Sequence, residues 1–131
     1  MNGIAQVAAL FGAVAYIGAA QLEMVFFNRP RAHKLLHVEV DDVRDVRMWA
    51  FVVGVRNVLV GVGTIVGLVM LHVGDVATGR VVVLTLAWYM LLASLAMAVA
   101  DLLGYWRPRG GSVIGTIGSS LPPLVVIIAA M

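Results

Sequence analysis

The apolar run from Met48 to His72 constrains this chain more than any other stretch of its sequence. It reads MWAFVVGVRNVLVGVGTIVGLVMLH, and its 25 residues are enough to cross a bilayer as one helix with some tilt. Arg56 and Asn57 lie about a third of the way along it, at a depth where an unpaired charge is costly. The sequence therefore predicts a membrane-spanning helix whose neighbours face Arg56 and Asn57.

Composition extends this conclusion to the rest of the chain. Of the 131 residues, 62% are hydrophobic and 12% are charged, whereas soluble domains are about 45–50% apolar and about 25% charged. A chain of this length has room for about four spans with short connections, and no appended soluble domain. We therefore expect an all-α polytopic membrane protein, a single membrane domain over residues 1–131 that forms a bundle of four transmembrane helices.

The expected spans cover residues 4–27, 48–72, 81–105 and 113–131. The start of the chain lacks the basic region of a signal peptide and is too long for its apolar core, so we interpret it as a mature first span. Residues 28–47 form a charged link, in which Pro30 suits the first turn of a short helix lying along the membrane interface. Asp41 or Asp42 would then cap the second span.

Small residues at spacings of three or four indicate helix-packing faces in spans two and four. Span two has two such faces, which predicts contacts with two neighbouring helices. A double proline in span four predicts a kink that frees nearby carbonyl groups. The predicted packing residues are Gly54, Gly61, Gly63, Gly67, Gly111, Gly115 and Ser119, and the predicted kink lies at Pro122 and Pro123.

Basic residues near the ends of the spans predict the orientation of the chain. The links 28–47 and 106–110 carry seven of the nine Lys and Arg residues, and the link between spans two and three carries only Arg80. The positive-inside rule places the two basic links in the cytoplasm. Both termini are then expected outside.

Glu23, Arg56 and Asp101 are charged residues that this topology brings to a similar depth. Counted from the cytoplasmic ends of their spans at 1.5 Å per residue, they lie about 7, 12 and 9 Å deep. Because an arginine can extend back toward the interface, we expect the three charges to converge near Asn57.

Two acids and one base would leave that cluster net negative, so one carboxyl should hold a proton or borrow a cation from His33, His37 or Arg107. Two interpretations remain open. Arg56 either ties span two to spans one and three, or it belongs to a proton, ion or ligand site.

Other kinds of chemistry have little support in the sequence. The chain has no Cys, which excludes disulfides and thiolate metal sites. His33 and His37 are four residues apart, but they lack a third ligand and are interpreted as an interfacial pair. A scattered net charge of +2 does not fit a nucleic-acid surface, and phosphate-loop, dinucleotide and nucleophile-elbow motifs are absent. We therefore expect no cofactor, no metal and no nucleic acid, and the lipid bilayer as the main partner.

An ordered set of short motifs resembles a known family. The motifs are Leu22-Glu23-Met24 at the end of span one, a basic stretch with a proline, Gly54 with Asn57 in span two, and Gly-Ser-Ser-Leu-Pro at 118–122. Together they resemble the bacterial membrane family called domain of unknown function 1304, along nearly the whole chain. The resemblance implies a four-span protein of the bacterial inner membrane and no established activity.

The chain departs from that family at two places. Its members typically carry Asn-Gln-Gly-x-Tyr-Asn in span two, whereas residues 52–57 here read Val-Val-Gly-Val-Arg-Asn. Ala15 and Tyr16 stand where the family has a Glu-His pair. Arg56 thus replaces an aromatic residue, and an ion pair between Arg56 and Glu23 would be peculiar to this branch.

Three classes of function fit the sequence to different degrees. We favour a non-catalytic bundle that self-associates, as a homo-oligomer, or serves as an accessory subunit of a membrane complex. The alternative is a proton- or ion-coupled small-molecule transporter or channel working as an oligomer. Its layout is similar to that of small multidrug transporters, although Glu23 lies nearer one membrane face than their acid. An enzyme acting on lipid or quinone, with Glu23 or Asp101 as general acid or base, has the least support.

Overall fold

The structure is a computed structural model that describes residues 1–38, 43–106 and 108–131, with residues 43 and 44 described by their backbone only. The predicted capping of the second span by Asp41 or Asp42 lies outside the described residues. The same holds for Arg107 as a source of positive charge.

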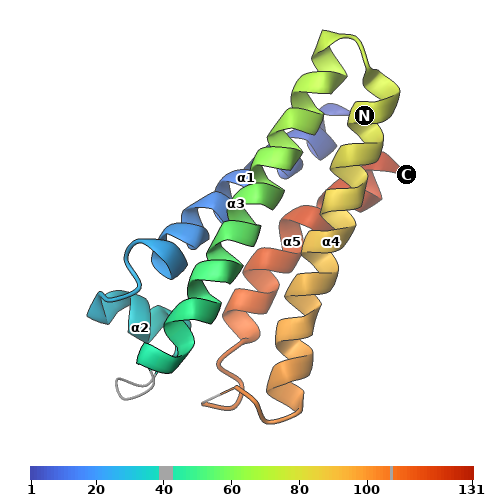
Figure 1. The fold of residues 1–131 in the computed structure, drawn as a ribbon. Coiled ribbons are helices and arrows are strands. Elements are labelled where there is room, and N and C mark those ends of the chain that lie inside the picture. The colour runs from blue at the N-terminus through green and yellow to red at the C-terminus, as the bar shows by residue number, and fades with distance from the viewer. Residues whose placement is uncertain (39–42, 107) are drawn as a thin grey trace.

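The described part of the chain consists of helices joined by short links, without strands. The long helices are α1 (Gly3–Met24), α3 (Val43–Val73), α4 (Val76–Leu102) and α5 (Val113–Ala130), and the short helix α2 (Pro30–Leu36) lies between α1 and α3 (Figure 1). Each long helix contains a stretch that is long and apolar enough to cross a membrane. The predicted fold class, a four-span helical bundle with a short helix after the first span, is confirmed.

The long helices alternate in direction and form a four-sided bundle. α1 packs against α3 and α5, and α4 packs against the same two helices, so α1 and α4 lie on one diagonal. Both termini and the α3–α4 link lie at one end of the bundle, and the α1–α3 and α4–α5 links lie at the other (Figure 1). The two basic links therefore share one end, which we name the basic end.

The helix boundaries differ from the expected spans by up to five residues. The largest change is in the link between α3 and α4, where the expected connection over residues 73–80 is reduced to Gly74 and Asp75. Asp75 caps α4 early because its carboxylate accepts a hydrogen bond from the backbone N–H of Thr78 at 3.0 Å. This bond also holds the pKa of the Asp75 carboxyl below its usual value. Local capping thus decides where a helix begins, and hydropathy alone does not reveal it.

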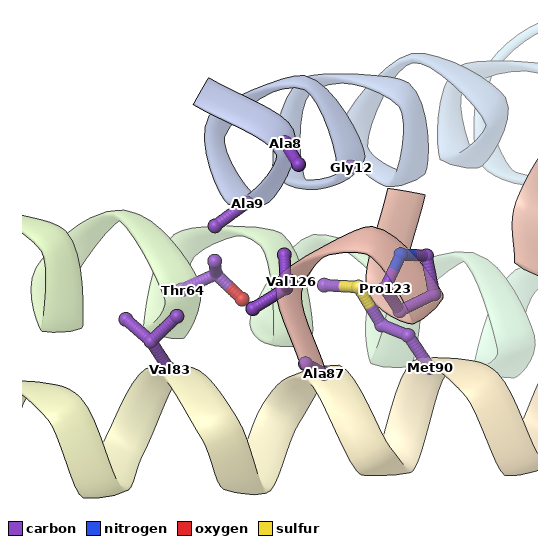
Figure 2. A pocket seen from close by; sticks show the side chains of 9 residues that line it. All are labelled: Ala8, Ala9, Gly12, Thr64, Val83, Ala87, Met90, Pro123 and Val126. Carbon is purple, nitrogen blue, oxygen red and sulfur yellow. The ribbon is translucent and has the colours of Figure 1, made fainter. Parts of the chain in front are cut away.

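The centre of the bundle is built mainly from small apolar side chains. Figure 2 shows residues of all four long helices around a cavity of about 10 Å³, which is about the space that one water needs. Thr64 points into this centre from α3, and its hydroxyl donates to the carbonyl oxygen of Val60 at 2.9 Å. From α5, the buried rings of Pro122 and Pro123 occupy the same region, and Pro122 lies close to Gly12 of α1.

Glycines on α3 bring both neighbouring helices close to its backbone. A Cβ atom at Gly61 would lie 2.8 Å from the carbonyl oxygen of Ala13 on α1, and one at Gly67 would lie 2.9 Å from the side chain of Val83 on α4. Because lipid provides little hydrophobic drive for helix association, such close approach supplies much of the packing energy. Of the other predicted packing residues, Gly54 faces α1, Gly63 and Gly115 face side chains of α4, and Gly111 lies in the α4–α5 link beside Trp106.

We predict that Gly61→Ala destabilises the bundle and that Gly18→Ala does not. The methyl group at position 61 would meet a backbone oxygen, so α1 must shift, at a cost of about 1–3 kcal/mol. No atom lies within 4 Å of a Cβ at Gly18, and alanine there gains up to about 1 kcal/mol of helix propensity. Unfolding in mixed detergent micelles, followed by far-ultraviolet circular dichroism, measures both effects. Equal stability of the two variants would contradict the close contact between α1 and α3.

Candidate functional site

Glu23 and Asn57 form a hydrogen-bonded pair between α1 and α3. The Nδ2 atom of Asn57 donates to both carboxylate oxygens of Glu23, at 3.2 Å from Oε1 and 3.1 Å from Oε2. Both side chains are half-buried, and Glu23 lies in the last turn of α1. Gly54 and Gly61, about one turn on either side of Asn57, allow the close approach that lets the amide reach the acid. The pair is thus a polar tie between two membrane-spanning helices.

Arg56 lies on a different side of α3 and does not join this pair. Its side chain is exposed, as are those of Trp49 and Leu59, which are seven and three residues away along the same outer side. Successive residues of a helix point about 100° apart, so with Asn57 directed at Glu23 the exposed Arg56 is turned away from α1. Gly54 and Gly61 bring α1 close to the side of α3 that carries Asn57. The expected convergence of Arg56 with Glu23 is therefore corrected to a contact between Asn57 and Glu23.

Asp101 is turned toward α5, at the corner of the bundle diagonal to α1. Its carboxylate accepts hydrogen bonds from the backbone N–H groups of Gly110 at 2.8 Å and Ser112 at 3.1 Å, and from the Ser112 hydroxyl at 2.6 Å. The residue is only 6% exposed. A negative charge beside the first N–H groups of a helix stabilises that helix, so Asp101 fixes the start of α5. The two acids lie at a similar depth, but each is held by its own partners.

Hydroxyl groups continue from Asp101 along the contact between α4 and α5. Ser120 donates to the hydroxyl oxygen of Ser94 at 2.8 Å, and Ser94 also contacts the hydroxyl of Ser119. The hydroxyl of Thr116, between these serines and Asp101, is buried and has no hydrogen-bond partner among the described residues. We name Ser94, Thr116, Ser119 and Ser120 the hydroxyl seam.

Sequence reasoning predicted Ser119 as a helix-packing residue but missed the hydroxyl seam. The signal for it is helical spacing, since residues 112, 116, 119 and 120 recur on one face of α5. Ser94 and Asp101, seven residues apart, share the face of α4 that meets it. The hydroxyl of Tyr16, on α1, reaches across the bundle and donates to the Met90 carbonyl of α4 at 3.1 Å.

The two basic links meet through aromatic and imidazole rings. The Nε1 atom of Trp106 donates to Nδ1 of His37 at 3.1 Å, and the ring of Phe27 meets that of His33 edge to face with centroids 5.6 Å apart. The two histidines thus contact different aromatic side chains. Within the part of the chain that the structure describes, no three His, Asp or Glu residues gather to hold a metal ion.

Comparison with models of protein families gives a match. The model of the family described as "Protein of unknown function (DUF1304)" matches residues 10–131, a range that includes Glu23, Asn57, Asp101 and the hydroxyl seam. No match was found among curated proteins or among solved structures.

We predict that double-mutant cycles identify Asn57, and not the adjacent Arg56, as the partner of Glu23. Combining Glu23→Ala with Asn57→Ala should reveal a coupling free energy of about 0.6–1.7 kcal/mol, the range for hydrogen bonds between membrane helices. The matched cycle of Glu23→Ala with Arg56→Ala should give coupling below about 0.5 kcal/mol, as for residues that share no contact. Unfolding free energies of the variants in detergent measure both values. A larger coupling free energy of Glu23 with Arg56 than with Asn57 would contradict this pairing and support the ion pair expected from the sequence.

Proposed function

This chain belongs to the DUF1304 family of proteins of unknown function, and we propose that it is a non-catalytic accessory subunit of a membrane complex. It contacts its partner through the outer side of α3. The partner is a different protein that spans the same membrane and places an acidic side chain opposite Arg56.

The position of Arg56 is the observation that carries this proposal. The side chain is exposed on the outer side of α3, among apolar residues such as Trp49 and Leu59, where lipid neutralises a charge poorly. The carboxylates at a similar depth in the same chain are engaged elsewhere, Glu23 by Asn57 and Asp101 by the link before α5. A carboxylate on a neighbouring spanning helix would neutralise Arg56 without moving it.

Like-charge repulsion favours a different protein over a second copy. In a symmetric pair of copies, both chains have the same orientation in the membrane and present the same surface to each other. An α3–α3 contact would then bring Arg56 against its own counterpart, and the repulsion of like charges is strong where the dielectric constant is low. On the outer side of α3, binding of a second copy is therefore less favourable than binding of a different protein.

A second candidate function, proton- or ion-coupled transport, is favoured by Glu23. This acid is half-buried in a spanning helix, and its hydrogen-bond donor is a neutral amide. Acids of this kind occur along proton and ion paths in membrane proteins. Proton flux into liposomes that contain the purified protein tests this function. Flux that is lost in Glu23→Gln would support it, and wild-type flux equal to that of Glu23→Gln would exclude this role for Glu23.

We predict that a photo-crosslinking residue at Leu59 captures the partner in native membranes. Leu59 is 64% exposed on the side of α3 that carries Arg56, and Leu92, 61% exposed on α4, is the matched control position. The adduct from position 59 should contain a different protein. Arg56→Gln should reduce it by about tenfold or more, because removal of one member of a desolvated charge pair is costly.

Arg47→Gln is the charge control for this experiment, because Arg47 is exposed on the same helix and is hydrogen-bonded to Asn28 at 2.8 Å. This variant should retain the adduct. An adduct of twice the 13.9 kDa chain mass would indicate a second copy and contradict the proposal. An adduct that persists in Arg56→Gln, or that forms equally from position 92, would contradict it as well.

A further inference from the structure

A groove of about 370 Å³ lies between α4 and α5 at the basic end. Ala98 and Leu102 line it from α4, Val113 and Ile117 line it from α5, and Arg109 lines it from the link. Its volume falls within the range of pockets that bind small molecules, about 300–1,000 Å³. Because α3 and α5 lie on opposite corners of the bundle, the groove is distinct from the outer side of α3.

The groove has two charged residues, Arg109 in the link and Asp101 at the end of α4, and an apolar lining along the helices. Arg109 is exposed, and a single long hydrogen bond of 3.4 Å joins its Nη2 atom to the Leu102 carbonyl. A guanidinium group has five N–H donors, so this contact uses a small part of its capacity. Asp101 also lines the groove, but it is only 6% exposed and its carboxylate is directed at its three donors from Gly110 and Ser112.

The link that carries Arg109 has the residues of a membrane interface. Tyr105 is 77% exposed, and Trp106 follows it, as in the aromatic belts found at the level of lipid headgroups. The apolar lining runs from this level along the α4–α5 contact. An occupant therefore needs a negative headgroup near Arg109 and an apolar tail beside Leu102 and Ile117.

We propose that this groove binds one anionic phospholipid, with its phosphate against Arg109 and an acyl chain along Leu102 and Ile117. The planar donors of arginine match phosphate oxygens, and basic pockets between spanning helices bind anionic lipid headgroups. The apolar lining selects a lipid over a free anion.

Native mass spectrometry of the protein released from vesicles tests this site. The vesicles contain equal parts of phosphatidylglycerol and phosphatidylcholine, and the measured quantity is the ratio of the two lipids that remain bound. The wild type should retain phosphatidylglycerol in excess. Arg109→Gln should lower the ratio about fivefold, the effect of one basic residue near an anionic headgroup. Arg47→Gln, at the same end but outside the groove, should leave it unchanged.

A second pair of variants tests the groove without changing charge. Ala98→Leu places a larger side chain in the groove and should reduce the binding of both lipids, whereas Ala93→Leu, on an exposed part of α4 outside the groove, should not. Far-ultraviolet circular dichroism verifies that each variant keeps its helices. An unchanged ratio in Arg109→Gln, equal losses in Arg109→Gln and Arg47→Gln, or full binding in Ala98→Leu would overturn the proposal. Displacement of the lipid by millimolar inorganic phosphate would assign the site to a free anion instead.

Discussion

The close approach of α3 to its two neighbours is the contact on which the rest of the structure depends. In lipid, helices gain little from burying apolar surface, so they associate where small residues let their backbones come together. Gly61 brings α3 against α1, and Gly67 brings it against α4. The amide of Asn57 then reaches the carboxylate of Glu23, which a larger side chain at Gly54 or Gly61 would prevent.

The two acids of the bundle have their hydrogen-bond partners in separate pairs of helices. Glu23 ties α1 to α3, while Asp101 and the hydroxyl seam tie α4 to α5. This division follows from the arrangement, because α1 and α4 lie on a diagonal and their acids have nearer partners. Burying a polar group costs little when a partner is at hand and much when none is. Arg56 is turned away from both clusters and lies exposed on the outside of the bundle.

Sequence patterns predicted the helices, and the two sides of α3 on which its glycines pack, better than they predicted the polar contacts. Apolar runs of more than about 20 residues and glycines at helical spacing are local signals, and they remain valid whatever the neighbours are. The partner of Glu23 depends on which of two adjacent residues, Arg56 or Asn57, faces α1. Depth alone cannot decide this, because it does not specify rotation about the helix axis. The hydroxyl seam was missed for a related reason, since its spacing has meaning only once α4 and α5 are known to be neighbours.

The residues that match the family string in span two are those that face inward. Gly54 and Asn57 match the string, and both lie on the side of α3 that packs against α1. Val52, Val53 and Arg56 depart from it; Val53 and Arg56 are exposed, whereas Val52 is half-buried. Two of the three departures thus lie on the exposed surface of α3, away from its contact with α1. The inner contacts fix the fold without fixing what binds outside it, so the outer side of α3 can differ while the bundle stays the same.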